Sequence, residues 1–124
     1  MGKPFGCELI LDLQGCDSRR FRRHHIERYM VELCDHIGMK RADLHFWDYD
    51  GNPELKEAAP DDLAGTSAVQ FIQTSSITIH ALDRLRAIYV NIFSCRDFEA
   101  RFAADFTAKF FRADSFTFNY VSRG

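Results

Sequence analysis

Three segments with the periodicity of β-strands follow one another in the second half of the chain, and they constrain its fold more than any other feature. They cover residues 67–73, 76–81 and 87–93, and the last alternates Ile88, Val90 and Ile92 with bulkier and polar neighbours. Such alternation is typical of half-buried strands. Together with strand-like segments nearer the two ends of the chain, they predict a sheet of four or more strands.

The remaining elements are predicted from caps, turns and periodicity. Residues 7–13 alternate as a first strand, 43–49 form a short second strand, and 116–120 form a closing strand. Asp17 or Ser18 can cap a helix that Gly38 ends, and its apolar stripe consists of Ile26, Tyr29, Met30, Leu33, Cys34 and Ile37. Residues 97–111 predict a second amphipathic helix, with aromatic residues at four-residue steps: Phe98, Phe102, Phe106 and Phe110.

The order strand, helix, strands, helix, strand argues for an α+β fold, a two-layer sandwich in which two helices cover one face of a mainly antiparallel sheet. The 124 residues fit a single domain, 1–124. The other face of the sheet is left bare, and a bare apolar face usually finds a partner, so we expect a homodimer formed face to face. Residues 54–65 are polar and predict a long exposed loop with room for one helical turn.

Charge and composition exclude several classes of function. The formal net charge is −2, and basic residues gather in one place only, at Arg19, Arg20, Arg22 and Arg23. This pattern does not indicate a nucleic-acid partner. No window has the length and apolar character of a membrane span, and the first residues lack the apolar run of a signal peptide, so a cytoplasmic protein without a membrane partner is expected.

The cysteines and histidines show no spacing that indicates a metal site. In the reducing compartment expected for this chain, free thiols are predicted for all four cysteines: Cys7, Cys16, Cys34 and Cys95. Ordinary surface or core roles are predicted for the residues most able to bind a metal: His24, His25, Cys34, His36 and His45.

Polar residues able to carry chemistry are concentrated between positions 67 and 95. They are Ser67, the run Thr74-Ser75-Ser76, His80 and Cys95. Taken singly, each has an ordinary structural interpretation as a strand-edge residue, a turn, a histidine bonded to backbone or a small buried thiol.

Taken together, these residues allow a sharper hypothesis. A serine hydroxyl can attack the carbonyl that precedes it and turn the peptide bond into an ester, and a nearby base can then eliminate that ester. The chain is cut and the serine becomes a pyruvoyl group, which accepts electrons when carbon dioxide leaves an amino-acid substrate. Cys95, just before the helix predicted from Asp97, is expected to reprotonate the product, because a helix N-terminus shifts a thiol toward reactivity.

Three segments resemble the prokaryotic S-adenosylmethionine decarboxylase proenzyme family. Residues 9–17, Leu-Ile-Leu-Asp-Leu-Gln-Gly-Cys-Asp, resemble the start of that family. Residues 75–80, Ser-Ser-Ile-Thr-Ile-His, resemble its Glu-Ser-His-Ile-Ser-Ile-His segment from the reactive serine onward. Residues 91–95, Asn-Ile-Phe-Ser-Cys, resemble its Asp-Val-Phe-Thr-Cys segment, and the two segments keep the family's separation.

The resemblance implies a fold, a cofactor and residue roles. It implies a dimeric sandwich that cuts itself between Thr74 and Ser75, with a pyruvoyl group derived from Ser75 as the cofactor. His80 and Ser67 would assist this processing, and Cys95 would donate the proton in decarboxylation. The implied small-molecule substrate is S-adenosylmethionine, and the product would feed spermidine synthesis.

Three positions depart from the family's pattern. Thr74 stands where the family has Glu, Ser76 replaces a His, and Arg84 falls where the family places a Glu that grips the ribose hydroxyls. Because a guanidinium only donates hydrogen bonds, Arg84 leaves open a pyruvoyl decarboxylase of a simpler amino acid such as arginine or ornithine. The changes at positions 74 and 76 leave open a homologue that is not cut and has a binding or regulatory role.

Overall fold

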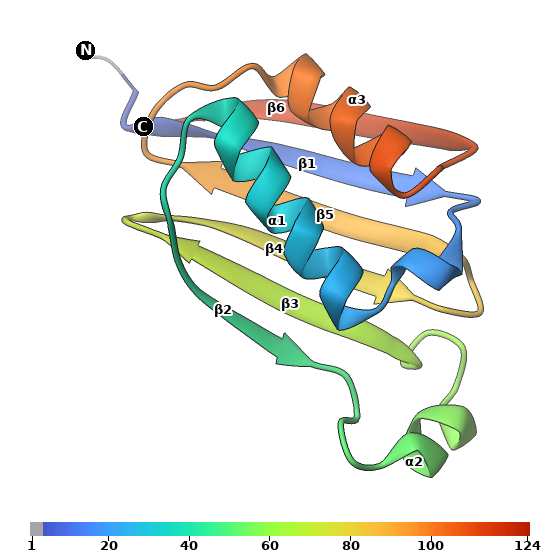
Figure 1. The fold of residues 1–124 in the computed structure, drawn as a ribbon. Coiled ribbons are helices and arrows are strands. Elements are labelled where there is room, and N and C mark those ends of the chain that lie inside the picture. Colours follow the sequence, from blue (N-terminus) through green and yellow to red (C-terminus); the bar gives the residue numbers. More distant parts are fainter. Residues whose placement is uncertain (1–3) are drawn as a thin grey trace.

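A computed structural model describes residues 4–124 and contains one six-stranded sheet in which every neighbouring pair of strands is antiparallel (Figure 1). The strand order is β2-β3-β4-β5-β1-β6. The strands are β1 (Gly6–Gln14), β2 (Arg41–Trp47), β3 (Gly65–Ile72), β4 (Ser75–Leu82), β5 (Ala87–Ser94) and β6 (Ser115–Arg123). The helices are α1 (Arg23–Ile37), α2 (Pro53–Ala58) and α3 (Ala100–Phe110), with a short 3-10 helix at Ser18–Arg20.

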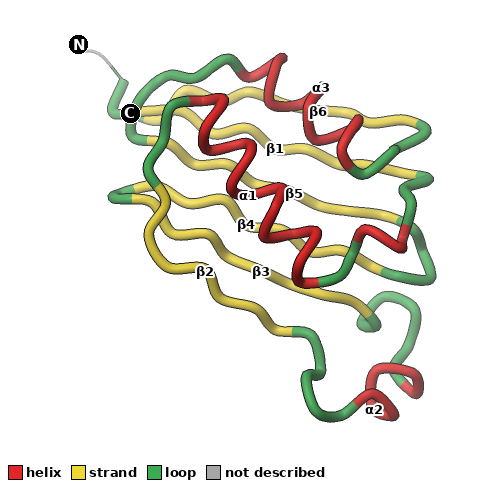
Figure 2. Tube along the Cα trace, in the orientation of Figure 1, coloured by secondary structure: helices red, strands yellow, loops and turns green. Residues whose placement is uncertain are grey.

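Helices α1 and α3 lie side by side on one face of the sheet, and α2 lies outside the sandwich near the end of β2 (Figure 2). No helix among residues 4–124 covers the opposite face, which we call the open face (Figure 1). The predicted α+β two-layer sandwich with two helices on one face is therefore confirmed. None of the helices that the structure describes is long and apolar enough to cross a membrane.

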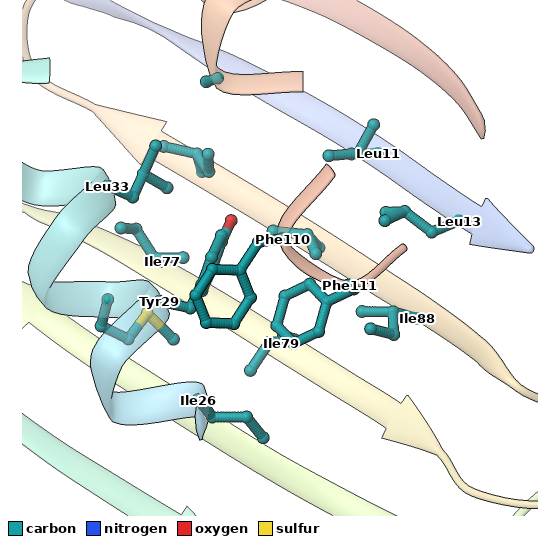
Figure 3. Close-up of a cluster of buried hydrophobic side chains, with 14 of the residues drawn as sticks. Leu11, Leu13, Ile26, Tyr29, Leu33, Ile77, Ile79, Ile88, Phe110 and Phe111 are labelled. Carbon is teal, nitrogen blue, oxygen red and sulfur yellow. The ribbon is translucent and has the colours of Figure 1, made fainter. Parts of the chain in front are cut away.

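The core fills the space between the two helices and the sheet (Figure 3). It confirms the predicted apolar stripe of α1, in which Ile26, Tyr29, Met30, Leu33 and Cys34 are buried. The hydroxyl of Tyr29 is 2.7 Å from Oγ1 of Thr107 on α3, so the polar atom that the large ring brings inside has a partner. This bond joins the two helices at the centre of the sandwich.

The predicted start of the first helix was wrong, whereas the aromatic residues predicted for the second mostly contact the core, with Phe110 buried and Phe98 and Phe106 partly buried. Asp17 caps the 3-10 helix through the backbone N–H of Arg19, and α1 begins only at Arg23. On α3 the face turned to the core consists of small residues as well as an aromatic one: Ala103, Ala104, Thr107, Ala108 and Phe110. Four-residue steps drift around a helix with 3.6 residues per turn, which leaves Phe102 42% exposed.

The other boundaries moved by a few residues. Strand β2 begins two positions before the predicted segment 43–49 and also ends earlier, at Trp47. The predicted loop 54–65 contains the short helix α2, which has Pro53 in its first turn, a favourable position because that N–H would have no helical partner.

Candidate functional site

Ser75 lies at the first position of β4, directly after a tight turn. Ile72 of β3 pairs with Ser75, so the turn consists of Gln73 and Thr74 alone. Ser75 as a whole residue is 7% exposed, and its Oγ accepts a hydrogen bond of 3.0 Å from the backbone N–H of Cys95. The hydroxyl predicted to be the nucleophile is therefore held in place by the end of the neighbouring strand.

Cys95 follows β5 and is partly exposed beside Ser75. Helix α3 begins at Ala100, so the prediction that a helix N-terminus activates this thiol was wrong. Instead, hydrogen bonds from Thr74 and then Ser75 hold the pKa of the thiol below its usual value, with a smaller contribution from the charge of Arg96. The thiol is more easily ionised for this local reason.

A cavity of about 250 Å³ opens onto this pair of residues. Its lining includes two cations, Lys40 and Arg96, that the sequence analysis did not single out. The guanidinium of Arg96 also donates to the carbonyl of Gly38 at the end of α1. Both cations lie on loops next to the cavity, and no periodic pattern in the sequence predicts the position of a loop residue. A small anionic group, such as a substrate carboxylate, fits the charge of this cavity.

Ser67 and His80 form a second pair, on the open face. They are directly paired across β3 and β4, and Ser67 Oγ is 2.6 Å from His80 Nδ1. Side chains alternate along a strand, so His80 shares the open face with Thr78, whereas Ser75 shares the helix-covered face with the buried Ile77. The structure therefore brings the four predicted residues together as two separate pairs rather than as one cluster.

The separation of the two pairs follows from strand geometry. Ser75 and His80 are five positions apart along β4, which at about 3.3 Å per residue places their backbones roughly 16 Å apart. The two side chains also point to opposite faces of the sheet. Within one chain, the imidazole of His80 cannot reach the Thr74–Ser75 peptide bond.

A groove of about 520 Å³ lies on the open face beside the second pair. Its walls carry three aromatic side chains, Trp47, Tyr49 and Tyr89, and one carboxylate, Asp62. The ring of Trp47 meets that of Tyr49 edge to face, with 5.0 Å between centroids, and the Tyr49 hydroxyl donates to the carbonyl of Leu63 at 2.8 Å. The groove can hold a flat ring against an aromatic wall and present an acceptor to hydroxyl groups.

Arg84, the third departure from the family's pattern, is not part of the groove lining. Its Nε donates to Asp61 Oδ1 at 2.7 Å, and its terminal nitrogens donate to the carbonyls of Ala59 and Glu57. The guanidinium therefore fastens the segment that contains α2 to the end of β4. This segment carries Asp62 into the groove.

Comparisons with known proteins agree with one another. The model of a family described as S-adenosylmethionine decarboxylase matches residues 7–124. The chain is 30% identical over 121 residues to the S-adenosylmethionine decarboxylase proenzymes of Thermoanaerobacter sp. (strain X514) and Thermoanaerobacter pseudethanolicus (strain ATCC 33223 / 39E), which covers 96% of this chain and 88% of each relative. The crystal structure of the adenosylmethionine decarboxylase from Aquifex aeolicus has a similar fold, with a TM-score of 0.78 and 17% identity over 99% of this chain and 93% of that one.

Proposed function

Because the chain belongs to the S-adenosylmethionine decarboxylase family, we propose that it is a proenzyme that cuts itself between Thr74 and Ser75 and then decarboxylates S-adenosylmethionine for spermidine synthesis. One observation carries the proposal: the Cys95 N–H fixes the Ser75 hydroxyl at 3.0 Å, beside the thiol that would return a proton to the product. The nucleophile of the first reaction and the acid of the second then share one cavity.

The residues around Ser75 fit a pyruvoyl group. The group would be made from Ser75 itself, and it supplies a carbonyl that accepts electrons when carbon dioxide leaves. Lys40 and Arg96 would bind the carboxylate of the substrate, while Cys95 would hold the proton that the product carbon takes up. The partly exposed thiol of Cys95 can exchange that proton with solvent after each turnover.

The groove on the open face supports an adenosyl substrate. S-adenosylmethionine carries a flat adenine, a ribose diol and a sulfonium cation, and the rings of Trp47, Tyr49 and Tyr89 can stack on the first and attract the last. Asp62 is the carboxylate that lines the groove, so we assign to it the acceptance of hydrogen bonds from the ribose hydroxyls, in place of the family's Glu. Arg84 then has a structural task in holding the segment that carries Asp62.

A homodimer through the open face would unite the two pairs of residues. Within one chain, Ser75 and His80 are roughly 16 Å apart along β4. In a dimer whose two sheets pack face to face, a two-fold axis that runs across the strands places one end of each sheet over the opposite end of the partner sheet. His80 and Ser67 would then assist processing in the partner chain. The open face offers large apolar side chains for such an interface: Ile10, Trp47, Phe71, Tyr89 and Val121.

We also place the protein in the cytoplasm, which fits four cysteines that are all unpaired: Cys7, Cys16, Cys34 and Cys95.

Intact-mass analysis of the fresh protein tests the proposal. We expect two fragments, residues 1–74 and 75–124, from the wild-type chain and from Ser76→Ala, but a whole chain from Ser75→Ala. Carbon dioxide release should then be compared for S-adenosylmethionine, arginine and ornithine. A whole wild-type chain that releases carbon dioxide would contradict the pyruvoyl scheme, and faster release from arginine or ornithine would contradict the assigned substrate. A whole chain without turnover would favour a binding or regulatory role.

A further inference from the structure

Thr74, whose carbonyl carbon would be attacked, has a backbone conformation that its side chain disfavours. Its φ angle is 55°, in the left-handed region where tight turns normally place Gly, Asn or Asp. Among the described residues other than glycine, four have a positive φ, and Thr74 is the only β-branched one of them. A branched Cβ makes this region especially unfavourable. The residue before the proposed cut is therefore strained.

The surroundings prevent Thr74 from relaxing. The pairing of Ile72 with Ser75 fixes both ends of the turn. Thr74 Oγ1 lies 2.8 Å from the carbonyl oxygen of Gln73, and the Cys95 N–H holds the Ser75 hydroxyl from the other side. Strain persists only where the surrounding structure imposes it in this way. Here it is concentrated on the residue whose carbonyl belongs to the Thr74–Ser75 peptide bond.

From this geometry we infer that Thr74 is a positioning residue for self-cleavage: its strained backbone raises the energy of the uncut chain and is released as the Thr74–Ser75 bond breaks. The inference rests on the proposed self-cleavage. In the first step, Ser75 Oγ bonds to the carbonyl carbon of Thr74, the C–N bond breaks, and the hydroxyl proton passes to the Ser75 nitrogen. Release of strain favours this step, in which an amide becomes a less stable ester.

The second step does not depend on Thr74. A base removes the Cα proton of Ser75, the bond from Cβ to Oγ breaks, and Thr74 leaves with a free carboxylate. The unsaturated residue that remains then takes up one water and loses ammonia, which gives the pyruvoyl group. Substitutions that relieve the strain should therefore slow formation of the ester and leave its elimination unchanged.

The test follows cleavage of the full chain by intact mass in a time course after cell-free synthesis. Thr74→Gly and Thr74→Asn tolerate a positive φ and are expected to be cut about tenfold more slowly than Thr74→Val, a difference of about 1.4 kcal/mol in activation free energy. Thr74→Val keeps the branched Cβ and loses only the hydroxyl. In a Ser75→Ala background, where nothing is cut, the Gly and Asn changes should raise the melting temperature by about 4 °C.

The opposite signs of the two effects separate strain from ordinary support, since a merely structural residue would lower the melting temperature when replaced. Arg112→Gly is the matched control, because Arg112 also has a positive φ, 54°, but lies after α3. It should raise the melting temperature without altering cleavage. If the wild-type chain is never cut, the proposed function and this inference both fail. If it is cut, but Thr74→Gly and Thr74→Asn are cut as fast as Thr74→Val, only this inference fails.

Discussion

His80 should act on Ser75 of a partner chain, and a mixing experiment can detect this. Two variants are co-expressed in this experiment. His80→Ala keeps a cleavable Ser75, and Ser75→Ala keeps the imidazole of His80. Each variant alone should stay whole. In mixed dimers, the intact imidazole of one chain lies over the strand end that carries the intact serine of the other, so the His80→Ala chain should be cut there. The reason is the distance of roughly 16 Å that separates the two residues along one strand.

The expected yield follows from random pairing of equal amounts of the two chains. About half of the His80→Ala chains then sit in mixed dimers, so about half should appear as two fragments by intact mass, while the Ser75→Ala chain stays whole. Thr78→Ala is the matched control, because Thr78 shares the open face and the strand with His80, and this variant should be cut without a partner. Dimers that form but leave every chain whole would refute the reasoning. So would normal cleavage of His80→Ala alone.

Three further predictions concern the interface, the thiol and the core. Phe71→Glu, which places a charge on the open face, should convert the dimer to a monomer in analytical ultracentrifugation, whereas Phe102→Glu on the helical side should leave a dimer. In the uncut chain, the rate of Cys95 alkylation should reach half its limit at a pH below 9.0, the usual thiol pKa, because the lowered pKa of Cys95 supplies thiolate at lower pH. Cys16, whose pKa is raised by burial to about 11, should stay unreactive. If alkylation of Cys95 reached half its limiting rate only above pH 9, the result would contradict this prediction. Tyr29→Phe removes the buried hydrogen bond to α3 and should cost about 1–2 kcal/mol of unfolding free energy in urea denaturation. A loss below about 0.3 kcal/mol would show that the bond contributes little.

The fold could be predicted from the sequence because strand and helix periodicities are local. The alternation that ends at Phe93 and the stripe through Tyr29 were both confirmed. The start of α1 was misplaced because Asp17 caps a 3-10 helix as readily as an α-helix, and a capping residue alone does not distinguish them. The aromatic spacing predicted α3 as an amphipathic helix, but it gave no sign that small residues such as Ala104 also face the core, where they let the helix approach the sheet.

The site was less accessible to sequence reasoning, since its geometry depends on contacts between distant segments. Spacing alone could nominate Ser75 and Cys95, but only the pairing of β4 with β5 shows that a backbone N–H, and not a helix terminus, joins them. Lys40 enters the cavity from the connection after α1, and no local pattern marks it. The opposite facing of His80 could have been deduced from its odd separation from Ser75, which places the two on different sides of a strand.

The order of strands in the sheet has a consequence for the cut molecule. Cleavage after residue 74 would leave one piece with β1, β2 and β3 and another with β4, β5 and β6, yet β1 lies between β5 and β6. The two pieces would thus interlock, and neither could depart without tearing hydrogen-bonded ladders apart. Reassembly after complete unfolding would require two molecules to meet, so recovery would depend on protein concentration. A chain of this topology gains by folding first and being cut afterwards, while its halves are still one polymer.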